Sequence, residues 1–152
     1  MISLKQENQG FTIIELLIVI IVIGILATLI ITTLGDIQRN DRNRNREAEV
    51  KEIHNRVEYY YGQKDHYPSL AQVNELAGFE GWRAENLRGL SQAMLQDPKG
   101  EDGVLVAEPA PGAYSYQVTP DGCDNSKEKL CESYTLTATY EGGGVYVQKS
   151  FN

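Results

Sequence analysis

The feature that most constrains this chain is an apolar run from Phe11 to Leu34 whose only ionisable side chain is Glu15. As a helix that rises about 1.5 Å per residue, the run would reach roughly 36 Å, enough to cross the ~30 Å hydrocarbon core of a membrane. A carboxylate inside such a segment costs roughly 2.5–3.5 kcal/mol on insertion scales. We therefore predict one membrane-spanning helix and treat Glu15 as a candidate functional residue.

The run opens with the sequence GFTIIE, from Gly10 to Glu15, and continues as LLIVIIVIGILA. This pattern resembles the N-terminal signature of type IV pilins and the related pseudopilins. The resemblance implies that a prepilin peptidase cuts between Gly10 and Phe11 and methylates the new N-terminal Phe11. It also implies that Glu15 neutralises the free amine of a neighbouring subunit during filament assembly. The physics agrees, because an amine and a carboxylate that are each costly in hydrocarbon largely offset one another when paired.

Two other interpretations of the apolar run stay open. It could be an ordinary uncleaved signal anchor in which Glu15 reaches the headgroup region. It could also be a secretory signal peptide, although the segment before Gly10 has a single lysine, Lys5, and no A-x-A-like cleavage site follows the run.

Beyond the run, the spacing of apolar residues predicts a helix with one apolar face. Val50, Ile53 and Val57 recur three and four residues apart, and Gly62 is predicted to end the helix because glycine readily adopts the left-handed conformation. We expect four parts: a leader peptide at 1–10, a transmembrane half of the long helix at 11–34, an amphipathic half at 35–62, and a globular part at 63–152.

The globular part is predicted to form an antiparallel sheet. Alternating residues indicate four strands, at 103–107, 113–119, 133–140 and 145–151. A short capped helix is expected directly after Ser69. The predicted fold class is α+β and pilin-like: a long N-terminal transmembrane and amphipathic helix packed on a small antiparallel sheet of four strands.

Cys123 and Cys131 enclose a short polar loop. The membrane segment should deliver this part of the chain outside the cytoplasm, where thiols are oxidised, so a disulfide between the two residues is predicted. Two reduced thiols are the alternative. The spacing excludes a C-x-x-C redox or zinc arrangement.

The formal net charge of −7 disfavours the bulk of the chain as a nucleic-acid binder. Four arginines nevertheless follow the apolar run: Arg39, Arg42, Arg44 and Arg46. We interpret them as a solvated helix face that touches lipid headgroups or a neighbouring subunit, with DNA binding as the alternative. By the positive-inside rule they indicate a cytoplasmic location for the following residues, which conflicts with the topology that the resemblance implies.

The sequence has no nucleophile elbow, P-loop, dinucleotide fingerprint or histidine-based zinc motif, so an enzyme is not expected. His54 and His66 are interpreted as surface residues. Three acids, Asp97, Glu101 and Asp102, could supply oxygen ligands for calcium, but the full spacing of an acidic calcium loop is absent. No cofactor is therefore expected.

The predicted function is that of a structural subunit of a type IV pilus. The resemblance implies a single-pass prepilin in the cell membrane and an extracellular pilus after assembly. Its implied partners are further copies of the chain, the prepilin peptidase, and the pilus assembly platform with its ATPase. The main alternative is the major pseudopilin of a type II secretion or competence system. A second alternative, from another class, is a membrane-anchored binding domain that does not polymerise.

Overall fold

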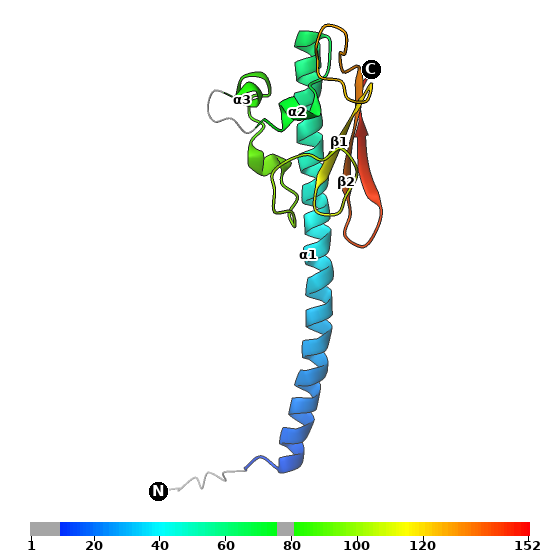
Figure 1. The fold of residues 1–152 in the computed structure, drawn as a ribbon. Helices are drawn as coiled ribbons and strands as arrows, with labels where there is room; N and C mark the ends of the chain where they lie inside the picture. The colour runs from blue at the N-terminus through cyan, green and yellow to red at the C-terminus, as the bar shows by residue number, and fades with distance from the viewer. Residues whose placement is uncertain (1–9, 76–80) are drawn as a thin grey trace, which may run out of the picture. The chain divides into compact units, whose positions relative to one another are not determined.

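The structure, a computed structural model, describes residues 10–75 and 81–152, so most of the predicted leader lies outside the described residues. The chain divides into two compact units, Met1–Arg39 and Asn40–Asn152, called here the N-terminal unit and the C-terminal unit. Helix α1, Ile13–Lys64, contributes residues to both units. Figure 1 shows the order of the elements along the chain.

The described residues of the N-terminal unit from Ile13 onward are all part of α1, and neither glycine in this stretch interrupts the helix. The hydroxyls of Thr28 and Thr33 donate hydrogen bonds to carbonyls of the preceding turn, at 2.7 and 2.9 Å. These bonds satisfy both hydroxyls within the helix. Among the described residues α1 is the one helix long and apolar enough to cross a membrane, in agreement with the sequence prediction.

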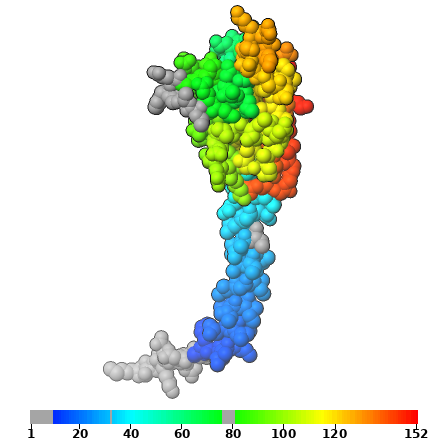
Figure 2. Space-filling model, viewed as in Figure 1, coloured from blue at the N-terminus to red at the C-terminus, as the bar shows by residue number. Residues whose placement is uncertain are grey.

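The core of the C-terminal unit lies between one face of α1 and the sheet. Val50, Ile53 and Val57 are fully buried, as their spacing predicted. They form one cluster with residues of the sheet, including Tyr116 and Leu136, and this burial removes apolar surface from water. Figure 2 shows the close packing of the described segments of this unit.

The sheet consists of β1 (Tyr114–Thr119), β2 (Ser133–Thr139) and β3 (Val145–Lys149), in the order β1-β2-β3 with antiparallel neighbours. Tyr116 pairs with Leu136, and both side chains point into the core, whereas Val147, which pairs with Thr137, is exposed. The α+β, pilin-like fold class predicted from the sequence is confirmed.

The predicted strand at 103–107 is wrong, and the described residues form a three-stranded sheet rather than a four-stranded one. The side-chain amide of Asn74 hydrogen-bonds both backbone groups of Leu105: it accepts from the N–H at 2.7 Å and donates to the C=O at 2.7 Å. These groups are therefore not available to a neighbouring strand. Only an isolated bridge between Val106 and Ser115 remains beside β1. Two prolines follow at Pro109 and Pro111, and proline cannot donate to a ladder.

Helix α1 ends at Lys64, two residues beyond the predicted end at Gly62. The residue with the left-handed backbone is Asp65, with φ of 59°, and its N–H donates to the carbonyl of Tyr61 at 2.9 Å. Aspartate is one of the few residues besides glycine that visits this conformation routinely. The prediction that Gly62 ends the helix was therefore wrong, because the left-handed residue is Asp65.

Between α1 and the sheet, the described residues form three short helices: α2 (Leu70–Val73), α3 (Trp82–Asn86) and the 3-10 helix η1 (Gln92–Leu95). Ser69 caps α2, as predicted, in a capping box with Gln72. The predicted disulfide between Cys123 and Cys131 is present. Its loop is also tied to the chain after α1, because the N–H of Tyr67 donates to the carbonyl of Cys131 at 2.8 Å.

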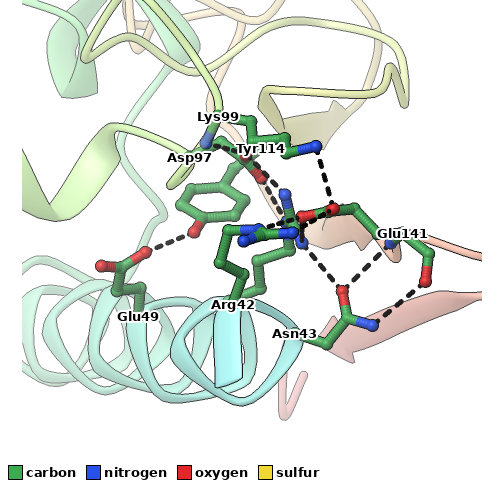
Figure 3. Close-up of polar contacts among 8 residues, drawn as sticks. Arg42, Asn43, Glu49, Asp97, Lys99, Tyr114 and Glu141 are labelled. Carbon is green, nitrogen blue, oxygen red and sulfur yellow. Dashed lines mark hydrogen bonds and ion pairs between the residues drawn. The ribbon is translucent and has the colours of Figure 1, made fainter. Parts of the chain in front are cut away.

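A network of charged side chains joins α1 to the sheet and to the loop after η1 (Figure 3). Arg46 and Asp97, each 1% exposed, form a bidentate pair at 2.6 and 2.8 Å. Glu141 lies in the β2–β3 connection. Its carboxylate accepts two hydrogen bonds from Arg42, at 2.6 and 2.7 Å, and forms an ion pair with Lys99 at 3.1 Å. We call this set the Glu141 network; its members are Arg42, Asn43, Arg46, Asp97, Lys99 and Glu141.

Asn43 completes the network by binding the backbone of Glu141 on both sides. Its side-chain oxygen accepts the N–H of Glu141 at 3.0 Å, and its amide donates to the carbonyl at 3.2 Å. The hydrogen bond to Asp97 raises the pKa of Arg46. The hydrogen bonds from Arg42, aided by Lys99 and Arg46, hold the pKa of Glu141 well below its ordinary value of 4.5.

Two interpretations from the sequence are corrected here. Arg42 and Arg46 do not belong to a solvated face, because both are held by carboxylates of the C-terminal unit, whereas Arg44 is exposed as expected. His54 is not a surface residue: it is 6% exposed, with its Nδ1 2.7 Å from the hydroxyl of Tyr134. Each partner is many residues away in the chain, so helical spacing alone does not reveal it.

Replacing Arg46 with methionine should lower the unfolding free energy by about 3–5 kcal/mol, because Asp97 would be left buried without its cation. Denaturant unfolding of the full chain in detergent micelles, followed by circular dichroism, measures the change. The exposed Arg44→Met is the matched control. The paired change Arg46→Met with Asp97→Leu should recover most of the loss, and a stable Arg46→Met single variant would contradict this account.

The stability of the C-terminal unit should fall as the pH is lowered. Glu141 has a depressed pKa in the folded state, so its contribution is present above its unfolded pKa near 4.5 and is lost as the pH falls toward the folded pKa. In Glu141→Gln the unfolding free energy should depend less steeply on pH between about 5 and about 3. The exposed Glu132→Gln serves as control, and equal slopes for wild type and Glu141→Gln would refute the assignment.

Candidate assembly site

The first turn of α1 is closed by a capping box between Thr12 and Glu15. The backbone N–H and the hydroxyl of Thr12 both donate to Oε2 of Glu15, at 2.9 and 2.8 Å. In return, the hydroxyl oxygen of Thr12 accepts the N–H of Glu15 at 3.2 Å. This arrangement satisfies backbone groups that have no partner within the helix, and it places a carboxylate at the positive end of the helix dipole.

The same geometry leaves half of the carboxylate open. Both bonds from Thr12 end on Oε2, and Oε1 of Glu15 accepts no hydrogen bond from the residues that the structure describes. The side chain is also exposed. Since an ionised carboxylate can accept about four hydrogen bonds, Oε1 is available to a donor from outside the chain.

The peptide bond between Gly10 and Phe11 lies outside the helix. Residues 10–12 have no helical assignment, and Phe11 is 83% exposed. A Cβ placed on Gly10 would meet nothing within 4 Å, so the described fold does not itself require a glycine there. An enzyme could therefore reach this bond without unfolding α1.

The large apolar side chains of the run are all exposed in the single chain, from Phe11 to Leu34. Soluble monomers rarely expose contiguous apolar surface on this scale. Lipid or other apolar helices must cover it, and either cover surrounds the first turn with a medium of low polarity. The open oxygen of Glu15 therefore lies at the edge of a surface that is built to be buried.

The sequence is similar to several known proteins. A family model described as the prokaryotic N-terminal methylation motif matches residues 5–31. The type II secretion system core protein G of Escherichia coli K12 is 30% identical over 124 residues, which cover 77% of this chain and 85% of that protein. Its counterpart from Klebsiella pneumoniae is 25% identical, with 82% and 94% covered.

A pilin is similar to a comparable degree. The type IV major pilin protein PilA of Myxococcus xanthus is 30% identical over 108 residues, which cover 71% of this chain and 48% of that protein. No solved structure matches the chain. The chain belongs to the type IV pilin and pseudopilin family.

The structure gathers the three residues predicted from the motif, Gly10, Phe11 and Glu15, at the start of α1. It adds Thr12, which the motif carried without a stated role. The T-x-x-E spacing of a capping box was the signal that could have identified Thr12 from the sequence. Cleavage, methylation and subunit pairing at these positions remain predictions.

One of the three acids considered as calcium ligands, Asp97, is already bound to another side chain. Asp97 is held by Arg46 and accepts the N–H of Lys99 at 2.8 Å. Within residues 10–75 and 81–152 no three histidine, cysteine or acidic side chains are grouped to hold a metal ion. The expectation that the chain needs no cofactor is not tested by this and stays a prediction.

Replacing Thr12 with valine keeps the branched shape but removes the hydroxyl that both donates to and accepts from Glu15. Loss of an N-cap costs about 1 kcal/mol, so amide hydrogen exchange at Glu15 and Leu16, whose N–H groups bind Thr12, should accelerate roughly fivefold. Thr12→Ser retains the hydroxyl and should exchange like wild type. Exchange measured in detergent micelles that is equal for Thr12→Val and wild type would rule out the capping box.

Proposed function

We propose that this chain is a structural subunit of a type IV pilus, processed between Gly10 and Phe11, methylated at Phe11 and polymerised through its N-terminal segment. The observation that carries the proposal is the open oxygen of Glu15 on the first turn of an exposed apolar helix. The membership of the family supports it. Fibre function in adhesion, motility or DNA uptake would follow from the filament.

Cleavage after Gly10 creates a positive charge where the chain previously had none. The new α-amine on Phe11 would be costly in hydrocarbon, as Glu15 is. Oxygen Oε2 of Glu15 is already occupied by Thr12 of the same chain, whereas Oε1 is open. We assign Oε1 as the acceptor for the Phe11 amine of a neighbouring copy. The pair neutralises both charges and fixes the stagger between adjacent helices.

Assembly then buries the apolar surface of the N-terminal unit against other copies. Packing between helices drives the association within lipid, and the removal of apolar area from water adds to it once the helices leave the membrane. The proposed partners are further copies of the chain, the prepilin peptidase, and an assembly platform with its ATPase. The proposed course is a single-pass prepilin in the cell membrane followed by an extracellular fibre.

A second candidate is the major pseudopilin of a type II secretion system, which would use the same helix in a short periplasmic fibre. Coverage favours it, because this chain spans 85% and 94% of core protein G from Escherichia coli and Klebsiella pneumoniae but 48% of the Myxococcus xanthus pilin. The two candidates share the chemistry of the first turn and differ in where the fibre ends.

The N-terminal residue and its mass should be determined in protein from sheared surface material and from membranes. Methylated Phe11 in the sheared fraction is the expected result for a pilus subunit. The same terminus confined to membranes and to short periplasmic fibres identifies a pseudopilin. An intact Met1 would contradict both candidates.

The Glu15→Leu variant tests the role of the carboxylate. We expect it to be inserted, but to enter fibres at least roughly tenfold less than wild type, because the amine of the next copy loses its partner. The matched control is Asp36→Asn, an exposed acid beyond the apolar run. Fibres of normal yield from Glu15→Leu would contradict the proposed pairing.

A further inference from the structure

A cleft of about 520 Å³ lies in the C-terminal unit between the end of α1 and the residues of and after α3. Figure 1 shows these two segments next to each other. The lining includes three cations, Arg56, Lys64 and Arg88, against one acid, Glu85. The feature is unusual in a chain whose net charge is −7. We call it the α1–α3 cleft.

One wall of the cleft is held in place by Arg56. Its guanidinium binds Glu52 at 2.7 and 2.6 Å and donates to the carbonyl of Arg88 at 2.9 Å. Gly89, with φ of 85°, lets the chain pass close to this guanidinium, since a Cβ there would lie 3.3 Å from its Cζ. The guanidinium of Arg56 therefore fixes the position of the chain around Arg88.

The groups that face outward from the cleft are unpaired. The side chains of Lys64 and Arg88 are exposed, and neither forms an ion pair with the described part of the chain. Tyr59 is 68% exposed at the same place. Tyrosine and arginine are enriched in protein interfaces, where a ring supplies contact area and a guanidinium supplies directed hydrogen bonds.

An acidic segment, opposite in charge to the cleft, lies at a different position along α1 in the same unit. Glu101 and Asp102 are exposed neighbours, and within the described ranges neither carboxylate has an ion pair. Their turn is anchored at the level of Arg46, because Asp97 pairs with that residue. From Arg46 to Tyr60, which lines the cleft, α1 rises about 21 Å at ~1.5 Å per residue.

We infer that the α1–α3 cleft of one copy receives the acidic turn Glu101–Asp102 of a second copy. Two different surfaces at separate positions along one unit form a heterologous contact, which does not close as a symmetric dimer and repeats into an open helical assembly when its rotation closes no ring. Opposite charge also offsets the repulsion between acidic copies. The inference adds a specific contact to the proposed filament function. It rests on that function, because only in a filament does the contact repeat from copy to copy.

Other acidic side chains fit this role less well. Asp121 lies just before the disulfide loop and Asp124 lies within it, and Asn125 of the same loop donates to the carbonyl of Tyr67 just beyond the end of α1. They are therefore anchored at the same end of the unit as the cleft. If one copy is shifted along the direction of α1, the region around its Arg46, with the acidic turn, can lie beside the cleft of the other copy. The same shift moves its disulfide loop away from that cleft.

Engineered disulfides test the contact in the full chain, expressed with its assembly machinery. The native cysteines are bonded to each other, so Arg88→Cys and Asp102→Cys introduced together supply one thiol to each side of the contact. Mild oxidation of fibres should produce a ladder of covalent multimers that each single variant lacks. The control pair Arg88→Cys with Asp121→Cys should give no ladder. Fibres of normal yield without a ladder from the test pair would overturn the inference.

Charge reversal supplies a second, independent measurement. Arg88→Glu should lower fibre yield roughly fivefold or more through repulsion of the acidic turn, and adding Asp102→Lys should restore it. Lys149→Glu, at an exposed site on β3, is the control for a change in net charge. Unchanged yield in Arg88→Glu, or no rescue in the double variant, would contradict the contact.

The same cross-link in the membrane fraction separates this inference from the proposed function. If wild type forms no fibres but the test pair cross-links in membranes, copies meet through the cleft and the filament function fails. If wild type forms fibres and the test pair does not cross-link, the filament function stands and the cleft contact fails. Absence of both fibres and cross-links would overturn the two together.

Discussion

The helix α1 has to satisfy two different environments, and the rest of the chain depends on this constraint. In the N-terminal unit its large apolar side chains are exposed, and the described residues of the same copy do not cover them. In the C-terminal unit only one face, with Val50, Ile53 and Val57, is buried, and the chain's own sheet covers it. The first half therefore requires lipid or other copies, while the second half completes a core within the chain. Glu15 lies in the half that needs an external partner.

The Glu141 network holds the sheet connection against α1 by charge as well as by packing. A buried pair such as Arg46 with Asp97 is weak evidence of net stabilisation, because desolvation offsets much of the attraction. Its geometry is nonetheless specific: bidentate contacts fix the register of the β2–β3 connection and of the loop after η1 against the helix. The acidic turn Glu101–Asp102 follows directly from that anchored loop, so the network also sets the level at which a second copy would meet it.

Much of this arrangement was predictable from local patterns. The apolar run, the spacing of Val50, Ile53 and Val57, the cap at Ser69 and three of the strands all follow from residues close together in the chain. Three of the misses have a common cause. Asn74 occupies the backbone of Leu105, Arg46 finds Asp97, and His54 meets Tyr134, and each pair is far apart in sequence. Periodicity assigns a face to a residue but cannot reveal a specific distant partner. At the candidate site, the motif identified Glu15, whereas the capping role of Thr12 was missed although the T-x-x-E spacing signals it.

The central claim is that Glu15 accepts the α-amine of Phe11 from another copy through its open oxygen. A density map of the fibre from electron cryo-microscopy, resolved to side chains around the first turn of α1, measures this directly. The account predicts a methylated Phe11 nitrogen within about 4 Å of the Glu15 carboxylate of a neighbouring copy, with Thr12 of the same chain still bound to the other oxygen. A fibre in which the amine lies elsewhere and Glu15 contacts only its own Thr12 would contradict it.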